Sequence, residues 1–297
     1  MPALTRTYAA VEATDRTDEH YSEQDVREEM QDGETLAAFA PDGAVVAFAR
    51  LHGSRDQARL DGAVVPEARG RGHGRRLLAW GEERARELQR AALRLDVHDN
   101  NPSKEALVRA AGYEAARWDY RMTRSLEDPL PVAPPTSPGL VLTPYARERD
   151  DAVRRAHGDA FAEHWGSTAP DEDHWANSFT GMRAFQPDLS WLVVDSEEVA
   201  GYVLTYFWEA DAAGSGVREA FVGQLGVRAP WRRRGLGALL LASTLESSKA
   251  AGFERAVLTV DTANATGALG LYERAGFVVK DRSTAWTKQL DVRRGTS

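Results

Sequence analysis

Cysteine is absent from the 297-residue sequence. Its absence excludes disulfide frameworks, thiolate zinc sites and any mechanism that uses a cysteine nucleophile or an acyl-cysteine intermediate. Long apolar runs are also missing: no stretch approaches the about 18 residues of a membrane-spanning helix, and the N-terminus lacks the basic-then-apolar order of a signal peptide. We therefore expect a soluble, cytoplasmic protein without a membrane partner.

Lysine is scarce and the net charge is negative. Four of the 37 basic residues are lysine, and the formal net charge is −8. An acidic chain is a poor general binder of nucleic acid, so we expect no nucleic-acid partner. The arginines gather around two glycine-rich stretches, residues 67–79 and 231–242, which predicts small, local anion sites.

A Pro-rich stretch divides the chain. Residues 125–139 contain five prolines and almost no periodic apolar pattern, which is typical of an extended linker. We therefore predict an N-terminal domain over residues 1–124 and a C-terminal domain over residues 140–297.

The two halves align with one another. Gly72 matches Gly235 at an offset of 163 residues, and Gly112 matches Gly276 at an offset of 164. A nearly constant offset indicates an internal duplication.

Apolar spacing predicts the elements of each half. A helix over 237–251 stops at Gly252, which suits a left-handed C-cap. The N-terminal half repeats the order from Thr35 onward, but its front end is shorter, without a clear equivalent of the first strand and full helical region. The elements expected in the C-terminal half are a strand at 139–145, a helix at 148–161, an irregular passage at 162–179, a hairpin of 190–195 and 199–208, a strand at 218–227, the helix at 237–251, a strand at 255–261, a helix at about 265–275, and two last strands around 277–281 and 284–290.

Each half carries an Arg-x-x-Gly-x-Gly turn between a strand and a helix. Such a turn exposes backbone amides at the positive end of the helix dipole, which suits a phosphate or pyrophosphate. A dinucleotide fold would need a third glycine where Leu240 and Leu77 stand, and a nucleotide-triphosphate loop would need Gly-Lys-Ser/Thr, which the sequence lacks. The motif residues are Arg232, Gly235 and Gly237 in one half and Arg69, Gly72 and Gly74 in the other.

This pattern resembles the coenzyme A pyrophosphate loop of the GNAT superfamily of N-acetyltransferases. In that family the turn is followed by a strand, a helix with Asn early and Leu-Tyr-Glu late, and then Gly-Phe, all of which occur in residues 257–279. The resemblance covers essentially the whole C-terminal half. It implies acetyl-CoA as the cofactor and an α+β (mixed α/β) fold of two tandem GNAT-like domains, each a central, mostly antiparallel twisted sheet flanked by helices.

The resemblance also implies which residues contact the cofactor. In the family, the strand ahead of the turn splays from the next strand to admit the cofactor, and a backbone amide near Leu225 to Val227 stabilises the oxyanion. Asn264 would cap its helix and contact the pantetheine arm. The implied cofactor-binding residues are Leu225, Gly226, Val227, Arg232, Arg233, Arg234, Gly235, Leu236, Gly237, Ala238 and Asn264, together with Arg69, Gly70, Arg71, Gly72, His73 and Gly74 of the N-terminal turn.

Acetyl transfer to an amine needs a deprotonated amine and a proton for the departing thiolate. The resemblance implies that Tyr272 donates this proton. A phenol with a pKa of about 10 stays protonated at neutral pH and can act as the acid. A helix aromatic packed in the core is the alternative interpretation. As the base we consider Glu219, which shares a strand face with Phe221 and Leu225 if alternation holds, and which could draw the amine proton through water. A solvated glutamate at the strand start is the alternative.

The acceptor amine would contact the irregular passage of the C-terminal half. Glu163, His164 and Trp165 begin an acidic and aromatic rim that suits a cationic amine or an amino sugar. A merely hydrated charged loop is the alternative. The two histidines of this passage have no metal-ligand spacing, and we predict no metal site. The other residues of the acidic and aromatic rim are Asp171, Asp173, His174 and Trp175.

The two halves differ at the proton donor, because Val108 aligns with Tyr272. We therefore expect the N-terminal domain to be catalytically degenerate, and either to bind coenzyme A still or to act as a scaffold. This layout is similar to that of the mycothiol synthases, although residues 163–175 do not obviously match them.

These observations predict an acetyl-CoA-dependent N-acetyltransferase. Its C-terminal domain would move an acetyl or short acyl group to a primary amine of a small molecule by direct transfer in a ternary complex, with the protein a monomer or homodimer. Mycothiol synthase activity proper, a non-catalytic acyl-CoA sensor and a protein acetyltransferase remain open alternatives.

Overall fold

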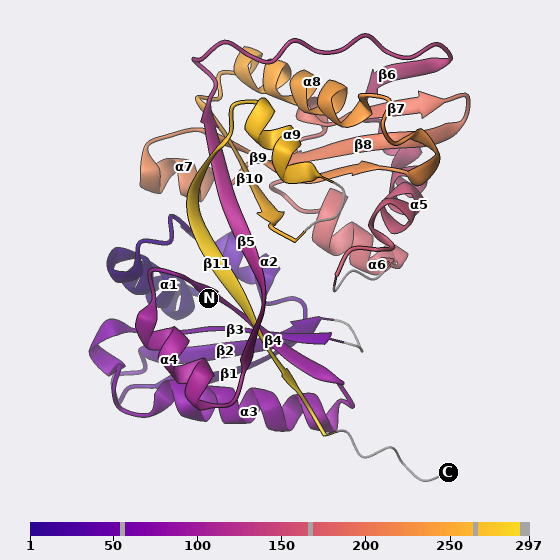
Figure 1. Ribbon diagram of the computed structural model, residues 1–297. Helices are drawn as coiled ribbons and strands as arrows, with labels where there is room; N and C mark the ends of the chain where they lie inside the picture. Colours follow the sequence, from indigo (N-terminus) through magenta and orange to yellow (C-terminus); the bar gives the residue numbers. More distant parts are fainter. Residues whose placement is uncertain (54–56, 166–168, 264–266, 292–297) are drawn as a thin grey trace, which may run out of the picture. The chain divides into compact units, whose positions relative to one another are not determined.

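The computed structural model describes residues 1–53, 57–165, 169–263 and 267–291. Residue contacts divide the chain into two compact units (Figure 1). Unit 1 contains Met1–Asp119 and Asp281–Ser297, and unit 2 contains Tyr120–Lys280. Each unit combines a mostly antiparallel sheet with helices, which confirms the predicted mixed α/β fold.

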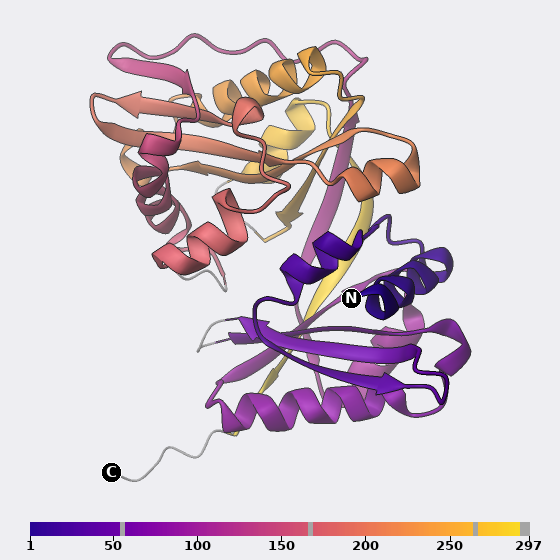
Figure 2. The same cartoon turned by 180° about the vertical axis from the view of Figure 1, so that it is seen from behind.

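In unit 1, the strand order is β1-β2-β3-β4-β11. The β3–β4 pair is parallel, and the other pairs of this sheet are antiparallel. Helix α3 covers one sheet face, while α1 and α2 lie on the opposite face (Figures 1 and 2). The elements are α1 (Pro2–Asp15), α2 (Glu23–Glu29), β1 (Glu34–Phe39), β2 (Val45–Gly53), β3 (Gln57–Val64), α3 (His73–Glu87), β4 (Ala92–His98), α4 (Pro102–Ala110) and β5 (Glu114–Ser125).

In unit 2, the strand order is β5-β10-β9-β8-β7-β6. Strands β9 and β10 are parallel, whereas β6, β7, β8 and β9 pair antiparallel in succession. Helices α8 and α9 cover one face, and α5 and α6 cover the other (Figure 1). The elements are β6 (Leu140–Pro144), α5 (Asp150–Phe161), α6 (Glu172–Trp175), β7 (Trp191–Asp195), β8 (Glu198–Tyr206), α7 (Glu209–Ser215), β9 (Glu219–Val227), α8 (Leu236–Ala250), β10 (Arg255–Asp261), α9 (Ala268–Arg274) and β11 (Val278–Gln289).

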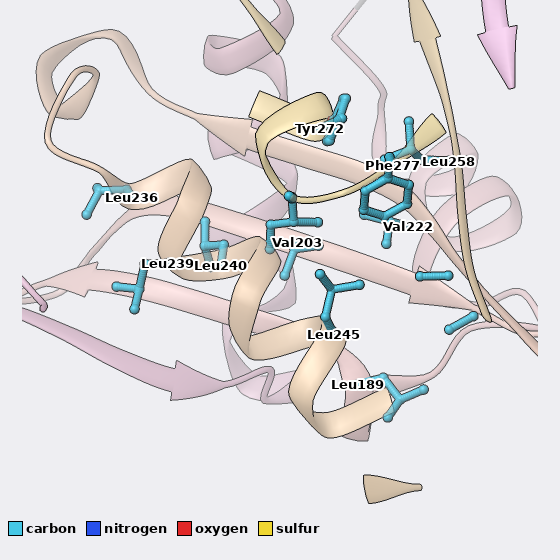
Figure 3. Packing of buried hydrophobic residues seen from close by; sticks show 14 of the residues in the cluster. Leu189, Val203, Val222, Leu236, Leu239, Leu240, Leu245, Leu258, Tyr272 and Phe277 are labelled. Atoms are coloured by element: carbon cyan, nitrogen blue, oxygen red, sulfur yellow. The ribbon is translucent and has the colours of Figure 1, made fainter. Parts of the chain in front are cut away.

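The core of unit 2 is built around α8. This helix is apolar on nearly all sides, and Leu240, Leu241 and Leu245 are almost fully buried. Figure 3 shows Leu240 and Leu245 on this helix within the core cluster. Burying each such leucine contributes about 1.5–3 kcal/mol relative to leaving it exposed. The helix ends just before Gly252, whose φ of 78° confirms the expected left-handed cap. No helix in the described ranges is long and apolar enough to cross a bilayer.

The last strand differs from its prediction. Instead of two strands, residues 278–289 form the single strand β11, which begins in unit 2 and ends in unit 1. Its second half, Ser283–Gln289, pairs with β4, and Trp286 packs in the core of unit 1. Unit 1 therefore includes the end of the chain, whereas the sequence prediction placed it with the C-terminal domain.

The front end of unit 1 also differs from its prediction. Two helices, α1 and α2, precede β1 where no full helical region was expected, although no strand is found among residues 1–33. Apolar periodicity missed α1 because this helix buries little of its surface, with Thr7 its one buried residue.

In unit 2, the passage expected to be irregular contains α6 and a π-helical turn, Ala176–Thr180.

The Pro-rich segment has no regular structure between Ser125 and Leu140. It is nevertheless packed onto unit 2, because Leu126 is buried in the core beside α8 and Leu130 contacts the same cluster. The guanidinium of Arg124 donates to the Pro129 carbonyl over 3.1 Å. The segment is therefore part of the surface of unit 2.

Candidate functional site

The glycine turn of unit 2 delivers the chain from β9 to an uncapped helix N-terminus. Gly235 is the N-cap of α8 with φ 77°, and no side chain caps the amides that follow. Arg233 has φ 61°, a left-handed conformation that is costly for a residue with a Cβ atom. Unpaired amides at the positive end of a 15-residue helix form a site suited to an anion.

The turn of unit 1 has nearly the same backbone. Gly72 is the N-cap of α3 with φ 84°, again without a side-chain cap, and Gly70 has φ 74°. Arg69 and Arg232 match closely, with ψ angles of 157° and 158°. Each half therefore builds the same amide cradle.

The motif arginines brace the turns. In both, the arginine Nε donates over 3.1 Å to the carbonyl at the end of the preceding strand, Val64 for Arg69 and Val227 for Arg232. The Arg69 guanidinium also forms a bidentate pair with Asp15, with both distances 2.8 Å. Through these contacts, Arg69 and Arg232 hold the backbone of their own turns.

The strands on either side of each turn separate. Registered pairs between β9 and β10 run from Glu219–Arg255 to Phe221–Val257, although both strands continue beyond that point. In unit 1, the β3–β4 pairs likewise stop at Arg59–Arg94. Residues Leu225, Gly226 and Val227 thus lie where β9 has left β10, as the expected splay requires.

A bulge distinguishes β9 from β3. The pairing with β8 shifts between Leu204–Gln224 and Thr205–Val222, so Gly223 is an extra residue. A Cβ atom on Gly223 would lie 2.5 Å from the Tyr206 ring, which explains the glycine. The bulge overturns the expected shared face: Phe221 packs toward α5 and α6, whereas Leu225 packs toward α8.

Tyr272 lies on α9 beside the turn. Gly237 lets α9 approach α8 closely, because a Cβ atom there would lie 3.3 Å from Leu271 Cδ2. Tyr272 is 8% exposed, and burial raises the pKa of Tyr272 to about 12. Figure 3 shows it on α9 at the margin of the core cluster, near Phe277. Because its pKa is raised, the Tyr272 phenol keeps its proton at neutral pH. Asn264, expected at the start of this helix, lies outside the described residues.

Glu219 is engaged by two arginines. Its Oε1 lies 2.6 Å from Arg255 Nη1, and its Oε2 lies 3.4 Å from Arg121 Nη2. It stands at the start of β9, where β10 is still paired. Both oxygens are thus held in ion pairs, and the base role of Glu219 stays a prediction.

The expected acceptor rim separates into two groups. Glu163 is highly exposed and lies 3.6 Å from Arg232, so it faces the turn, and the His164 ring lies 5.5 Å from that of Phe161. Trp165 follows them and is half-buried. Trp175, by contrast, is a core residue whose Nε1 donates to Asp150 over 2.9 Å. In the described part of the chain, no three acidic or histidine side chains are grouped to hold a metal.

A buried polar pair lies under β9. His157 Nδ1 is 2.6 Å from the hydroxyl of Tyr202, and Tyr202 stands opposite Gly226 on the neighbouring strand. Burial lowers the pKa of His157 to about 4, so the imidazole is neutral at pH 7. The aromatic residues around it, including Phe161, Trp175 and Phe179, fill this sheet face of unit 2.

Unit 1 has a cavity where unit 2 has this aromatic cluster. A cavity of about 740 Å³ runs from the glycine turn past the separated strands β3 and β4 to the helices α1 and α2. Val108, which aligns with Tyr272, is among its lining residues. At the opposite end, beneath α1 and α2, the cavity is lined by Tyr8, Tyr21, Glu29, Phe48 and Asp61. The sequence alone does not group these residues, because they come from four elements and the α1–α2 connection and share no common spacing. The charged Asp61 within the strand β3 is the available signal.

Comparisons with known proteins agree with this geometry. A family model described as Acetyltransferase (GNAT) family matches residues 3–113 and 151–277. A mycothiol acetyltransferase of Thermobispora bispora is 30% identical over 278 residues, covering 89% of this chain and 82% of the relative. The mycothiol acetyltransferase of Thermomonospora curvata is 32% identical over 241 residues, with coverages of 80% and 76%.

Solved structures of similar proteins cover both units. A GCN5-related N-acetyltransferase from Sphaerobacter thermophilus has 28% identity and a TM-score of 0.75, covering 97% of this chain and 91% of that chain. A tandem GNAT protein from the clavulanic acid biosynthesis pathway shares the fold, with 20% identity, a TM-score of 0.71 and coverages of 97% and 94%.

Proposed function

Because the chain belongs to the GNAT family of acetyltransferases, we propose that unit 2 transfers an acetyl or other short acyl group to the primary amine of a small molecule. The chain is an N-acetyltransferase, and its family generally uses acetyl-CoA as the acetyl donor. The observation that carries the assignment to unit 2 is the combination of an uncapped glycine turn, separated strands and Tyr272 within one unit.

The residues of the turn fit the proposed cofactor. The amides at the start of α8, from Leu236 to Ala238, would hold the pyrophosphate, and Arg233 and Arg234 are exposed beside them. Arg232 would keep the turn in place through its bonds to Val227 and Ala160. When bound, acetyl-CoA supplies an activated thioester.

Tyr272 would supply the proton for the thiolate. Its phenol is buried and protonated at neutral pH, and among the described residues no hydrogen bond engages its hydroxyl. A backbone amide of β9 between Leu225 and Val227 would stabilise the oxyanion, since this stretch has no registered pair with β10. Direct attack by the amine in a ternary complex fits a chain without cysteine.

The acceptor would contact Glu163, His164 and Trp165. The carboxylate of Glu163 is highly exposed and the aromatic groups beside it are half-buried, a combination that suits a cationic amine. For unit 1, we propose that residues 69–74 bind coenzyme A without transfer, since Val108 cannot donate a proton.

A thiol-release assay with acetyl-CoA tests this proposal. The acceptor panel contains amino sugars, polyamines, a lysine peptide and the acceptor used by mycothiol acetyltransferases. Turnover with a small-molecule amine supports the proposal, and turnover with the lysine peptide alone contradicts it. Silence across the panel, with acetyl-CoA binding detected by calorimetry, identifies a non-catalytic acyl-CoA sensor instead.

The mycothiol acetyltransferase activity is a second candidate. The relatives of that name are 30% and 32% identical over most of this chain, which favours a related acceptor. A preference for their acceptor over every other amine in the panel, measured as kcat/KM, would assign this activity.

A further inference from the structure

The far end of the cavity in unit 1 has aromatic walls. We name it the inner compartment and define it by Tyr8, Tyr21, Glu29, Phe48 and Asp61. The ring centroids of Tyr8 and Tyr21 are 4.3 Å apart, and those of Tyr8 and Phe48 are 5.0 Å apart. The electron-rich ring faces of tyrosine and phenylalanine attract cations. The compartment therefore has walls that suit an apolar body carrying positive charge.

Its carboxylates are held in fixed positions. Glu29 Oε2 accepts a hydrogen bond of 2.8 Å from the Tyr8 hydroxyl, and Asp61 Oδ2 lies 2.6 Å from His52 Nε2. The Arg50 guanidinium lies between them, 3.4 Å from Glu29 and 3.3 Å from Asp61. Arg59, whose charge also acts on Asp61, is itself paired with Asp96 over 2.7 Å. With Glu19, which also lines the cavity, three carboxylates face Arg50 and His52. The carboxylates therefore outnumber the cationic groups even with His52 counted as positive.

Burial makes the negative charge of Glu29 costly. Desolvation raises the pKa of Glu29, and the charge of Arg50 and the bond from Tyr8 only partly oppose it. Although burial opposes ionisation of Asp61 too, its hydrogen bond and charge interaction with His52 hold the pKa of Asp61 well below its usual range. A third carboxylate, Glu19, lines the cavity beside Tyr21, with an oxygen 3.5 Å from the phenol. A bound cation would compensate the buried charge of Glu29.

The compartment is distinct from the glycine turn. Asp61 pairs with Arg50, whereas the strand end that leads into the turn, Val64, pairs with Ala47. The side chains of Phe48, Arg50 and Asp61 occupy the sheet face under α1 and α2, opposite the core formed with α3. A ligand in the compartment and an anion at the turn would thus occupy different parts of one continuous cavity.

We propose that the inner compartment of unit 1 binds an organic ammonium ion, with its apolar groups against Tyr8, Tyr21 and Phe48 and its charge beside Glu29 and Asp61. This site makes unit 1 a ligand-binding unit in its own right. The proposal goes beyond the transfer proposed for unit 2 and does not depend on it, because every residue of the compartment belongs to unit 1.

Titration calorimetry on the full chain without coenzyme A tests the site. The probes are choline, phenethylamine and the neutral choline isostere 3,3-dimethylbutan-1-ol. We expect at least one ammonium to bind with a Kd below about 1 mM and the neutral isostere to bind at least tenfold more weakly. Glu29→Gln, which keeps an acceptor for Tyr8 but removes the charge, should weaken ammonium binding at least tenfold. Glu23→Gln, on the exposed side of the same helix, should leave it unchanged.

A second variant covers a folding failure of Glu29→Gln. Tyr21→Leu keeps an apolar side chain but removes the ring, and it should weaken the same ammonium several-fold. Circular dichroism and a thermal melt establish that each variant is folded. The proposal is overturned if neither ammonium binds, if the neutral isostere binds equally well, or if the folded variants bind like the parent protein. Acetyl transfer by unit 2 is assayed separately, so the two proposals can fail independently.

Discussion

The two glycine turns have almost identical backbones but lie in different surroundings. Gly72 and Gly235 cap their helices with φ, ψ angles of 84°, 1° and 77°, 2°, and each turn follows a strand that leaves its parallel partner after three registered pairs. Unit 2 adds a bulge at Gly223 and a tyrosine on α9. Unit 1 has regular pairing of β2 with β3, and Val108 in place of the tyrosine.

The sheet faces opposite the main cores differ even more. In unit 2, this face is filled by the aromatic cluster around His157 and Tyr202. In unit 1, Phe48 stands opposite Ala63 as Tyr202 stands opposite Gly226, and here the helices leave a cavity. The two units thus keep the same turn backbone while its surroundings differ. Unit 2 has Tyr272 and a filled aromatic face, whereas unit 1 has Val108 and a cavity.

The largest effect is expected from the residue that carries the proposed catalytic difference between the units. Tyr272→Phe deletes the proposed proton donor and should lower kcat by about 10²-fold with acetyl-CoA affinity nearly unchanged. Steady-state kinetics together with calorimetry of acetyl-CoA binding measure both quantities. Tyr206→Phe, a buried tyrosine on the other face of unit 2, is the control and should retain its activity. Unchanged turnover in Tyr272→Phe would make this residue a packing residue only.

Lowering the pH should destabilise unit 2, because His157 is buried in its aromatic cluster. The folded pKa of His157 is about 4, below the ordinary value of 6.5, so the unfolded chain binds the proton more tightly. The neutral imidazole of His157 leaves the folded state at its full stability above about pH 6.5, and this stability is lost as the pH falls toward 4. By linkage, this one group removes about 2 kcal/mol of unfolding free energy between pH 7 and pH 5.

Denaturant unfolding at the two pH values measures this loss. His157→Gln should unfold with a smaller pH dependence, whereas His73→Gln, at the start of α3 in unit 1, should behave like the parent protein. Equal pH dependence in all three proteins would refute the assignment to His157.

The turns themselves differ at one backbone position that can be exchanged. Arg233 has φ 61° where Gly70 has φ 74°. Removing the Cβ atom relieves left-handed strain of about 1–2 kcal/mol, and glycine's greater freedom in the unfolded chain offsets about 0.4–1 kcal/mol of this. Arg233→Gly should therefore raise the unfolding free energy by about 0.5–1 kcal/mol, and Gly70→Arg should lower it by a similar amount. Denaturant midpoints that shift in the same direction for both variants would show that strain is not the cause.

Local features explain what could be predicted from the sequence. The turn, α8, β10 and α9 were expected in the correct order because glycines mark helix ends and apolar spacing marks strands. The bulge had a signal too: Gly223 interrupts an apolar strand, a pattern often associated with bulges, yet strict alternation was assumed.

Features that depend on distant pairing could not be predicted in this way. The second half of β11 joins β4, about 190 residues earlier in the chain, and nothing in the local sequence of Ser283–Gln289 specifies that partner. The inner compartment likewise depends on how α1 and α2 cover β2 and β3. Residues such as Tyr8 and Glu29 line one compartment only in the folded unit, where α1 and α2 pack on the sheet.

The smallest effect on catalysis is expected from the arginine that braces the turn of unit 1. Arg69 is paired with Asp15 and bonded to the Val64 carbonyl, so Arg69→Ala should loosen that turn while acetyl transfer by unit 2 changes less than about twofold. The matched variant Arg232→Ala loses the same bond to Val227 and should raise the KM for acetyl-CoA because the cradle that would hold the pyrophosphate is less ordered. Steady-state kinetics of the two variants, measured side by side, test this asymmetry. A tenfold loss of kcat in Arg69→Ala would mean that the turn of unit 1 takes part in transfer, and the division of roles between the units would have to be abandoned.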